Sequence, residues 1–212
     1  ALTAFAHPRL VAAHDFLVLP DGSPAFTMAL EPGPALADAG VQAEAAVRRW
    51  LPDLLDALAP LHRAGLVHGD LRAENVRLRP DGGAVLLDLG HLAAAGAWDG
   101  ATAGSLAGLA PEGPSFGWRD RRADLYALGA LLYRATTGRD PFPLGTDGAA
   151  GLLRAHRAEV PAPLGRCVPG ISKALEALVT ALLAKRPEDR PADVAEVRAA
   201  LGLARGAAAD VL

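Results

Sequence analysis

The segment from residue 68 to residue 90 constrains the fold more than any other part of the chain. Two short apolar runs in it, 76–79 and 84–88, flank a turn pair, Asp81-Gly82. This arrangement is typical of a tight hairpin between antiparallel strands. Asp70 and Asn75 precede the predicted hairpin, and Asp88 closes it. We therefore expect the hairpin to return Asp88 to the side of Asn75, so that three oxygen-bearing side chains meet.

Three such side chains have the chemistry that phosphoryl transfer from ATP requires. One carboxylate must orient the attacking hydroxyl, and two oxygen ligands must hold Mg²⁺ against the phosphates. Asp70 suits the first role, and Asn75 and Asp88 suit the second. Arg72 would add positive charge beside the transferring phosphoryl group. The sequence thus predicts Asp70 and Arg72 as catalytic residues and Asn75 and Asp88 as metal ligands.

This segment resembles the catalytic loop of eukaryotic-type protein kinases, with Asp88-Leu89-Gly90 in place of their Asp-Phe-Gly motif. Further motifs occur in the family's order, and the resemblance covers about residues 3–201. The residues of these motifs are most similar to those of bacterial Ser/Thr kinases. It implies an α+β, mostly α, protein-kinase-like fold with ATP and Mg²⁺ as cofactors. The further motifs are His7-Pro8, Gly104-Ser105, Ala110-Pro111-Glu112, Asp124-Leu125-Tyr126-Ala127-Leu128-Gly129, Thr137-Gly138, Pro141-Phe142 and Arg190-Pro191.

The resemblance also indicates which residues would border the nucleotide. Met28 falls at the gatekeeper position, followed by Ala29, Leu30 and Glu31 as the hinge. Arg77 stands where the family places an apolar side chain under the adenine ring. Three interpretations of Arg77 stay open: it stacks on adenine as a cation over a π face, it blocks the pocket, or it pairs with an acid.

Four other residues have structural roles by the same resemblance. Glu112 and Arg190 would form an ion pair that matters more for shape than for stability. Asp124 would hold the backbone of the catalytic loop from a buried position, and His68 would pack in the core rather than act as a base.

Several features depart from the family pattern. Gly69 replaces an Arg, which removes the usual link to a phosphorylated activation loop, and Arg72 replaces a Lys with different geometry. The family also needs a glycine-rich loop, a strand lysine and a helix Glu upstream of His7. Only six residues precede His7, and the first lysine is Lys173. We therefore expect residues 1–31 to be a remnant of the small lobe, 32–203 the large lobe and 204–212 a tail.

Composition narrows the class of protein further. The chain has 212 residues, 51% of them hydrophobic, which is enough for one sizeable core. A net charge of −3 gives no basic excess, so nucleic acid is not an expected partner. The single cysteine, Cys167, cannot form an internal disulfide, and no apolar run reaches the ~18 residues of a membrane span. We expect a cytoplasmic protein whose partner is a protein substrate or a regulatory protein.

Patterns elsewhere predict the remaining elements. Apolar periodicity predicts helices over 43–64, 124–137, 148–158, 171–184 and 192–201. Residues 10–19 and 24–30 predict a hairpin, and 91–123 predicts a long functional loop. Four histidines, His14, His62, His91 and His156, have no metal-ligand spacing. Thr102, Ser105 and Ser115 are hydroxyls that a kinase could phosphorylate.

Three functions compete at this stage. The first is an ATP-dependent Ser/Thr protein kinase, inactive or weak as this chain alone because it lacks the lysine that positions the phosphates. The second is a pseudokinase that serves as a protein-binding module. The third is a small-molecule phosphotransferase of related fold, which His68-Gly69-Asp70 alone suggests and which Ala110-Pro111-Glu112 and Arg190 disfavour.

Overall fold

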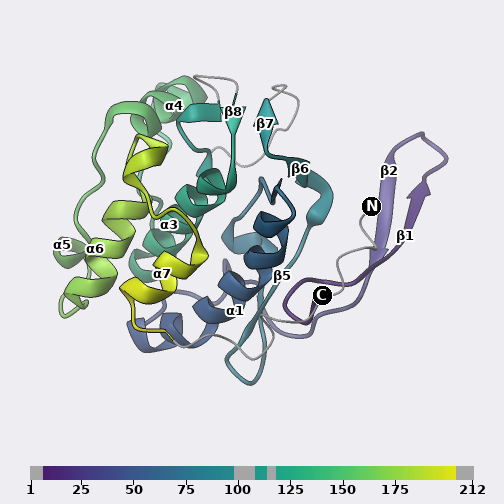
Figure 1. Ribbon diagram of the computed structural model, residues 1–212, viewed down its shortest axis with the longest axis horizontal. Coiled ribbons are helices and arrows are strands. Elements are labelled where there is room, and N and C mark those ends of the chain that lie inside the picture. Colours follow the sequence, from purple (N-terminus) through teal and green to yellow (C-terminus); the bar gives the residue numbers. More distant parts are fainter. Residues whose placement is uncertain (1–6, 98–107, 114–117, 204–212) are drawn as a thin grey trace.

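The computed structural model describes residues 7–97, 108–113 and 118–203, most of which lie in a helical body (Figure 1). The mostly helical fold expected from the sequence is confirmed. None of the helices in these ranges is both long and apolar enough to cross a membrane. The helices are α1 (Glu44–Arg63), α3 (Arg121–Thr137), α4 (Gly148–Ala158), α5 (Leu164–Cys167), α6 (Lys173–Leu182) and α7 (Val194–Ala200), with 3-10 turns at Ala73–Asn75, Leu89–His91 and Pro187–Asp189.

Helix α1 carries one side of the core because its apolar residues recur every three or four positions. Val47, Leu51, Leu54 and Leu58 are fully buried, and the helix packs against α3 and strand β5 (Ala84–Leu86). Burial of each leucine contributes roughly 1.5–3 kcal/mol to folding. Pro52 is tolerated inside the helix, and its carbonyl accepts a hydrogen bond from α7. The predicted helix over 43–64 is confirmed.

Helix α3 is buried on nearly every side, which explains why its sequence shows no clear polar face. It begins at Arg121, three residues before the predicted start, because the Asp120 carboxylate caps the Arg122 N–H at 2.7 Å. It ends at Gly138, which adopts a φ of 73° while its N–H donates to the Arg134 carbonyl at 2.8 Å.

Strands β4 (Val76–Leu78) and β5 form the predicted hairpin, and two further segments lie along its edges. The Leu36 N–H donates to the Val76 carbonyl at 2.8 Å, and the Val11 N–H donates to the Leu86 carbonyl at 2.9 Å. The hairpin is therefore held on both sides, and the segment that follows residue 31 runs directly beside β4.

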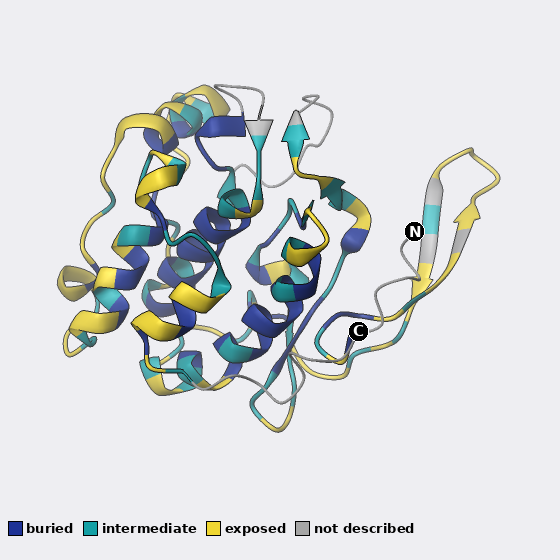
Figure 2. Ribbon diagram, in the orientation of Figure 1, coloured by how far each residue is buried: buried dark blue, intermediate teal, exposed yellow. Residues whose placement is uncertain are grey.

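The first hairpin, β1 (Ala13–Val18) with β2 (Pro24–Met28), projects from the helical body (Figure 1). Figure 2 shows that most of its described residues are exposed, and Val18 is 66% exposed. Its first strand is shorter than the predicted 10–19. Leu10 and Val11 lie on β5 instead, where they are 4% and 3% exposed.

The predicted long loop over 91–123 is irregular only in part. Strand β6 (Ala93–Ala94) pairs with β3 (Leu66–Val67), and β7 (Gly96–Ala97) pairs with β8 (Trp118–Arg119). Helix α5 was not predicted, because four residues are too few to show a period. Several predicted features lie outside the described residues. They are Gly104-Ser105 and Thr102 within 98–107, Ser115 within 114–117, and the expected tail 204–212.

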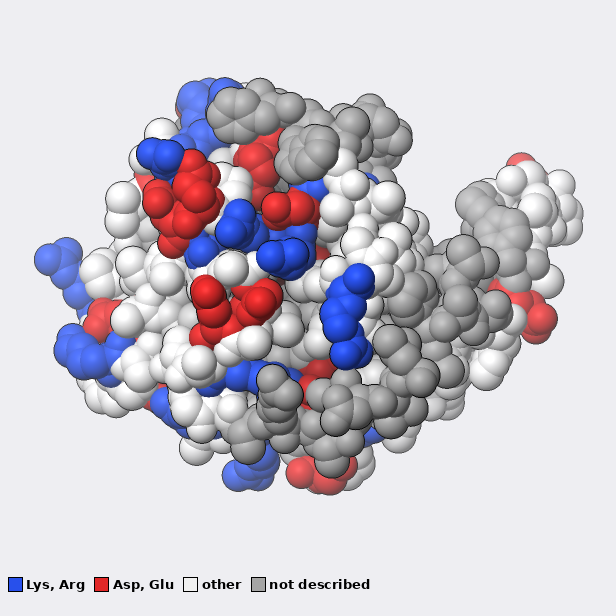
Figure 3. All heavy atoms as spheres, viewed as in Figure 1, with Lys and Arg blue, Asp and Glu red and all other residues white. Residues whose placement is uncertain are grey.

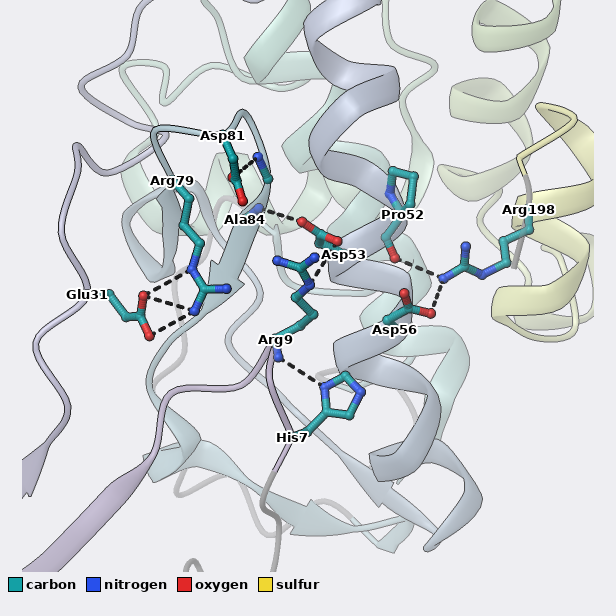
Figure 4. A network of polar contacts seen from close by, with 11 residues as sticks. His7, Arg9, Glu31, Pro52, Asp53, Asp56, Arg79, Asp81, Ala84 and Arg198 are labelled. Atoms are coloured by element: carbon teal, nitrogen blue, oxygen red, sulfur yellow. Dashed lines mark hydrogen bonds and ion pairs between the residues drawn. The ribbon is translucent and has the colours of Figure 1, made fainter. Parts of the chain in front are cut away.

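Basic and acidic side chains are interspersed on the face of the helical body shown in Figure 3. A polar network joins α1 to the hairpin and to α7 (Figure 4). The buried Asp53 carboxylate pairs with the Arg9 guanidinium at 3.0 Å and accepts the Ala84 N–H at 2.8 Å. Burial raises the pKa of Asp53, although both contacts oppose this shift. Arg198 of α7 donates to the Pro52 carbonyl at 2.9 Å and pairs with Asp56. These contacts fix the hairpin, and therefore its two ends, against the helical core.

Candidate active site

A buried carboxylate holds the loop that carries Asp70. Asp124 of α3 is 1% exposed, and its two oxygens accept the backbone N–H groups of His68 at 2.8 Å and Gly69 at 3.0 Å. His62 of α1 contacts the same carboxylate through Nε2 at 2.8 Å. Burial alone would raise the pKa of Asp124, but the hydrogen bond and positive charge of His62, with His68 and Gly69, lower it overall. Asp124 is thus placed as the sequence predicts.

His68 links this loop to the end of the hairpin. Its ring is fully buried, with Nε2 3.1 Å from the Leu87 carbonyl and Nδ1 3.3 Å from the Asp70 N–H. Because the Asp70 N–H can only donate, Nδ1 is the acceptor and Nε2 carries the proton. His68 therefore has the structural position expected of it.

The hairpin brings Asp70, Asn75 and Asp88 together. The Leu87 N–H donates to the Asn75 carbonyl at 2.7 Å, which returns Asp88 to the side of Asn75. The Asn75 Nδ2 group donates to the Asp70 carbonyl at 2.9 Å and to Asp70 Oδ2 at 2.8 Å. Carboxylate oxygens of Asp70 and Asp88 lie within 4.8 Å of each other.

The atoms left over at this point suit a hard divalent cation. Both Asn75 hydrogen bonds use the amide nitrogen, so Oδ1 remains as a ligand. Asp88 uses Oδ1 to accept the Gly90 N–H at 2.9 Å, which leaves Oδ2. Mg²⁺ takes oxygen ligands of this kind and retains several waters or phosphate oxygens. The residues present therefore fit Mg²⁺.

Asp88 has an unusual backbone conformation. Its φ of 57° makes it the only non-glycine residue with positive φ among the described residues. Such a conformation costs about 1 kcal/mol or more and persists where the surroundings impose it, often at functional sites. Here the Leu87–Asn75 hydrogen bond and the 3-10 turn that follows impose it.

Arg72 lies beside this group but is engaged with another residue. Its Nε donates to the Glu74 carboxylate at 2.8 Å, and Glu74 is also 3.8 Å from Arg134 of α3. The hydrogen bond that Arg72 donates to Glu74 raises the pKa of Arg72, and the charges of Asp70 and Asp88 add to this shift. Arg72 thus carries a full positive charge close to both aspartates.

Of the four expected hinge residues, Glu31 is held by the residue that follows β4. Glu31 forms a two-pronged ion pair with Arg79 at 3.2 Å, visible in Figure 4. Arg77 of β4 donates to the Gly33 carbonyl at 3.2 Å. Met28 and Leu30 are 40% and 94% exposed, and the Ala29 N–H pairs with the Ala12 carbonyl. The structure therefore joins Gly33 and Glu31 to Arg77 and Arg79, while Met28 and Leu30 face solvent.

A second buried ion pair fastens the segment that begins at Ala110. Glu112 accepts two hydrogen bonds from Arg190, both at 2.8 Å, and neither side chain is more than 5% exposed. Arg190 also donates to the carbonyls of Ala184 and Arg122 at 2.8 and 2.9 Å. The predicted Glu112–Arg190 pair is confirmed.

Comparison with known proteins agrees with this geometry. A model of the protein kinase domain matches residues 2–200. The chain belongs to the protein kinase family. This kinase domain is 37% identical over 214 residues to the serine/threonine-protein kinase Pkn1 of Myxococcus xanthus, an alignment that covers 96% of this chain and 31% of Pkn1.

Other bacterial Ser/Thr kinases are similar to a comparable extent. PknL of Mycobacterium tuberculosis is 34% identical over 187 residues, which cover 85% of this chain and 44% of PknL. The DNA damage-responsive kinase RqkA of Deinococcus radiodurans is 35% identical over 216 residues, which cover 96% of this chain and 32% of RqkA. The kinase domain therefore spans 31–44% of the length of these relatives.

Two residues near the site were missed by the sequence analysis. His62 supports Asp124, and its position in the last turn of α1 gave no signal of this contact. His91 places a ring nitrogen within 4.8 Å of carboxylate oxygens of Asp70 and Asp88. Its spacing of three residues from Asp88, across a 3-10 turn, is the signal that could have identified it.

Proposed function

We propose that this kinase domain carries the phosphoryl-transfer site of an ATP-dependent Ser/Thr protein kinase. The observation that supports this most is the convergence of Asp70, Asn75 and Asp88 on one point at the end of the hairpin. In this proposal residues 1–31 and 32–203 contribute the two sides of the nucleotide site, and the acceptor is a Ser or Thr hydroxyl of a protein.

Each residue at this point has one task. The Asp70 carboxylate accepts a hydrogen bond from the acceptor hydroxyl and aligns its oxygen for attack. Asn75 Oδ1 and Asp88 Oδ2 hold Mg²⁺, which, when bound with ATP, draws charge from the phosphate oxygens. Arg72 supplies the adjacent positive charge that stabilises the transferring phosphoryl group.

The hinge residues Met28, Ala29, Leu30 and Glu31 would border the adenine, with Arg77 beneath it. Of the three interpretations of Arg77, its hydrogen bond to the Gly33 carbonyl disfavours an ion pair with an acid. Two interpretations remain: the guanidinium stacks on the adenine ring as a cation over a π face, or it blocks the pocket.

We also propose that the polypeptide 1–212 transfers phosphoryl groups weakly or not at all by itself. The sequence contains two lysines, and neither suits the phosphates. Lys173 is highly exposed and pairs with Glu176, while Lys185 donates to the His156 carbonyl at 2.8 Å. The same observation favours a second function, a pseudokinase whose surface binds a protein partner.

Nucleotide binding to the purified chain tests the proposed site. A ligand that binds only the folded state raises the melting temperature by mass action. We expect a rise with ATP that requires Mg²⁺ and disappears in Asp88→Asn, while Asp38→Asn, the same change at an exposed position, keeps it. An unchanged melting temperature in the wild type, or a full rise in Asp88→Asn, would contradict the proposed nucleotide and metal site.

Transfer of label from γ-³²P ATP to casein tests the activity. We expect at most trace transfer by 1–212. Robust transfer that is lost in Asp70→Asn would refute the proposed weak activity and establish a working kinase. If neither binding nor transfer occurs, the pseudokinase remains.

A further inference from the structure

A cavity between α3, α5 and α6 shares no residue with the proposed phosphoryl-transfer site. Helices α5 and α6 lie at the end of the helical body opposite to the β1–β2 hairpin (Figure 1). The cavity has a volume of about 300 Å³. Sites for small molecules have volumes of about 300–1,000 Å³, so this cavity is large enough to be one. Its wall includes Tyr133 of α3, the segment 160–163, Leu164 of α5, Val179 and Leu183 of α6, and Lys185.

The cavity has a buried apolar floor and a rim that is open to solvent. Leu164, Val179 and Leu183 are buried, whereas Val160 at the rim is 84% exposed. The segment 160–163 carries two prolines, whose rings fix φ near −65°, and it crosses from α4 to α5 as extended chain. Because cavities with apolar walls hold water poorly and accept apolar molecules instead, a carbon chain is favoured in this space.

Lys185 is the charged residue of this wall in the described part of the chain. Its Nζ atom donates to the His156 carbonyl at 2.8 Å and to the Ala155 carbonyl at 3.4 Å, and it lies 4.3 Å from the centre of the Phe142 ring. An ammonium group has three N–H donors, and these two bonds use two of them. The third N–H has no acceptor among the described residues, so it can donate to an anion.

The other charges near the cavity also favour an anion. Arg190 and Glu159 act on Lys185, and Arg139 acts on the hydroxyl of the wall tyrosine. Arg190 is neutralised by its buried pair with Glu112, and the exposed Glu159 offsets one positive charge, so Lys185 and Arg139 leave one positive charge in excess. Around α5 one positive charge is again in excess, since the charged residues there are Arg166, Lys173 and Glu176.

We propose that this cavity binds an apolar monocarboxylate of about ten carbons, with its chain between α3, α5 and α6 and its carboxylate at Lys185 Nζ. The volume sets the chain length. A water molecule takes up about 30 Å³ of the liquid, and a methylene group is of similar size, so 300 Å³ holds roughly ten such groups. This binding site goes beyond the proposed function and requires neither nucleotide nor metal.

Isothermal titration calorimetry of the purified chain with straight-chain carboxylates tests the cavity by its size. We expect affinity to rise about four-fold with each methylene from hexanoate to decanoate, because each added group is buried. Dodecanoate should bind no more tightly than decanoate, since its last two methylenes find no further space. The absence of binding, or an affinity that keeps rising at the same rate to dodecanoate, would show that the cavity does not hold the chain.

Three variants locate the chain and the carboxylate. Thr180→Trp places a large ring at the exposed edge of the cavity and should weaken decanoate binding at least about ten-fold, whereas Ala177→Trp, on the same helix but outside the cavity wall, should bind as the wild type. Lys185→Met keeps a long apolar stem and removes the charge. It should weaken decanoate at least about ten-fold, as loss of a hydrogen bond to a charged group does, and leave decanol unchanged.

Melting temperatures close to that of the wild type establish that these variants are folded. If Thr180→Trp, once folded, binds decanoate as tightly as the wild type, the chain does not occupy this cavity. If Lys185→Met binds decanoate unchanged, or loses decanoate and decanol alike, the carboxylate does not bind Lys185. Either result would overturn the inference.

Discussion

Replacement of Asp124 by Asn should destabilise the kinase domain far more than the same change at the surface. The carboxylate satisfies two buried N–H groups, those of His68 and Gly69, and a third contact from His62. An amide has one oxygen and would turn its NH₂ group toward the remaining donor. One buried N–H left without a partner costs about 1–3 kcal/mol, and a charge-assisted bond reduced to a neutral one costs about 1 kcal/mol more.

We therefore expect Asp124→Asn to lower the free energy of unfolding by about 2–4 kcal/mol, out of a total of about 5–15 kcal/mol. Urea denaturation at neutral pH measures this change, and with a slope of about 2–3 kcal/mol per molar the midpoint should fall by about 1 M. Asp38→Asn should stay within about 0.5 kcal/mol of the wild type because Asp38 is exposed. Equal effects of the two substitutions would refute the role assigned to the buried carboxylate.

Acid should reduce the difference between the wild type and Asp124→Asn. The pKa of Asp124 is lower in the folded chain than its ordinary value of 3.8, despite burial, because His62 and the loop stabilise the charged form. The unfolded chain therefore takes up a proton first as pH falls. The stabilisation is complete above about pH 4–5 and is lost below this range, so the two urea midpoints should converge there.

Three further predictions concern stability. Glu112→Ala should lower the free energy of unfolding, measured by urea denaturation, by about 3–5 kcal/mol, because it leaves the buried charge of Arg190 without its carboxylate. A Glu112→Leu, Arg190→Met double variant should be more stable than this single variant. Gly129→Ala should cost about 1–3 kcal/mol, since a Cβ there would meet a side-chain carbon of α6 at 2.8 Å, whereas Gly145→Ala faces open space and should be near neutral. Burial lowers the pKa of Lys185 to about 8, below the ordinary 10.5. Between these two values the unfolded chain binds a proton that the folded chain lacks, so the free energy of unfolding should rise from about pH 8 to 10. In Lys185→Met the free energy of unfolding should stay flat over this range.

The parts of the site that sequence could predict depend on local pattern or on motif order. The hairpin that unites Asn75 and Asp88 follows from a turn pair between two apolar runs, and the structure contains it. The Asp124 contacts and the Glu112–Arg190 pair join residues 55 to 78 positions apart, and only the order of motifs made them predictable.

Other contacts could not be predicted because no local pattern encodes them. Glu31 meets Arg79 across 48 residues, and Arg77 meets the Gly33 carbonyl across 44, because residues 34–36 run along β4. Sequence alone left three interpretations of Arg77 open for this reason. His91 lies near Asp70 and Asp88 because the 3-10 turn that follows Asp88 carries it there.

The source of positive charge for the phosphates follows from the same contacts. Lys173 and Lys185 are held elsewhere by Glu176 and by the His156 carbonyl, whereas Arg72 lies close to Asp70 and Asp88. Arg72 is bound to Glu74, but Glu74 also lies 3.8 Å from Arg134, and this second cation would keep Glu74 paired if Arg72 turned away. Because the exchange leaves no charge unpaired, it costs little, and a surface ion pair of this kind is worth at most about 1 kcal/mol. We infer that Arg72 can move from Glu74 toward a phosphate beside Asp70 at a cost of at most about 1 kcal/mol.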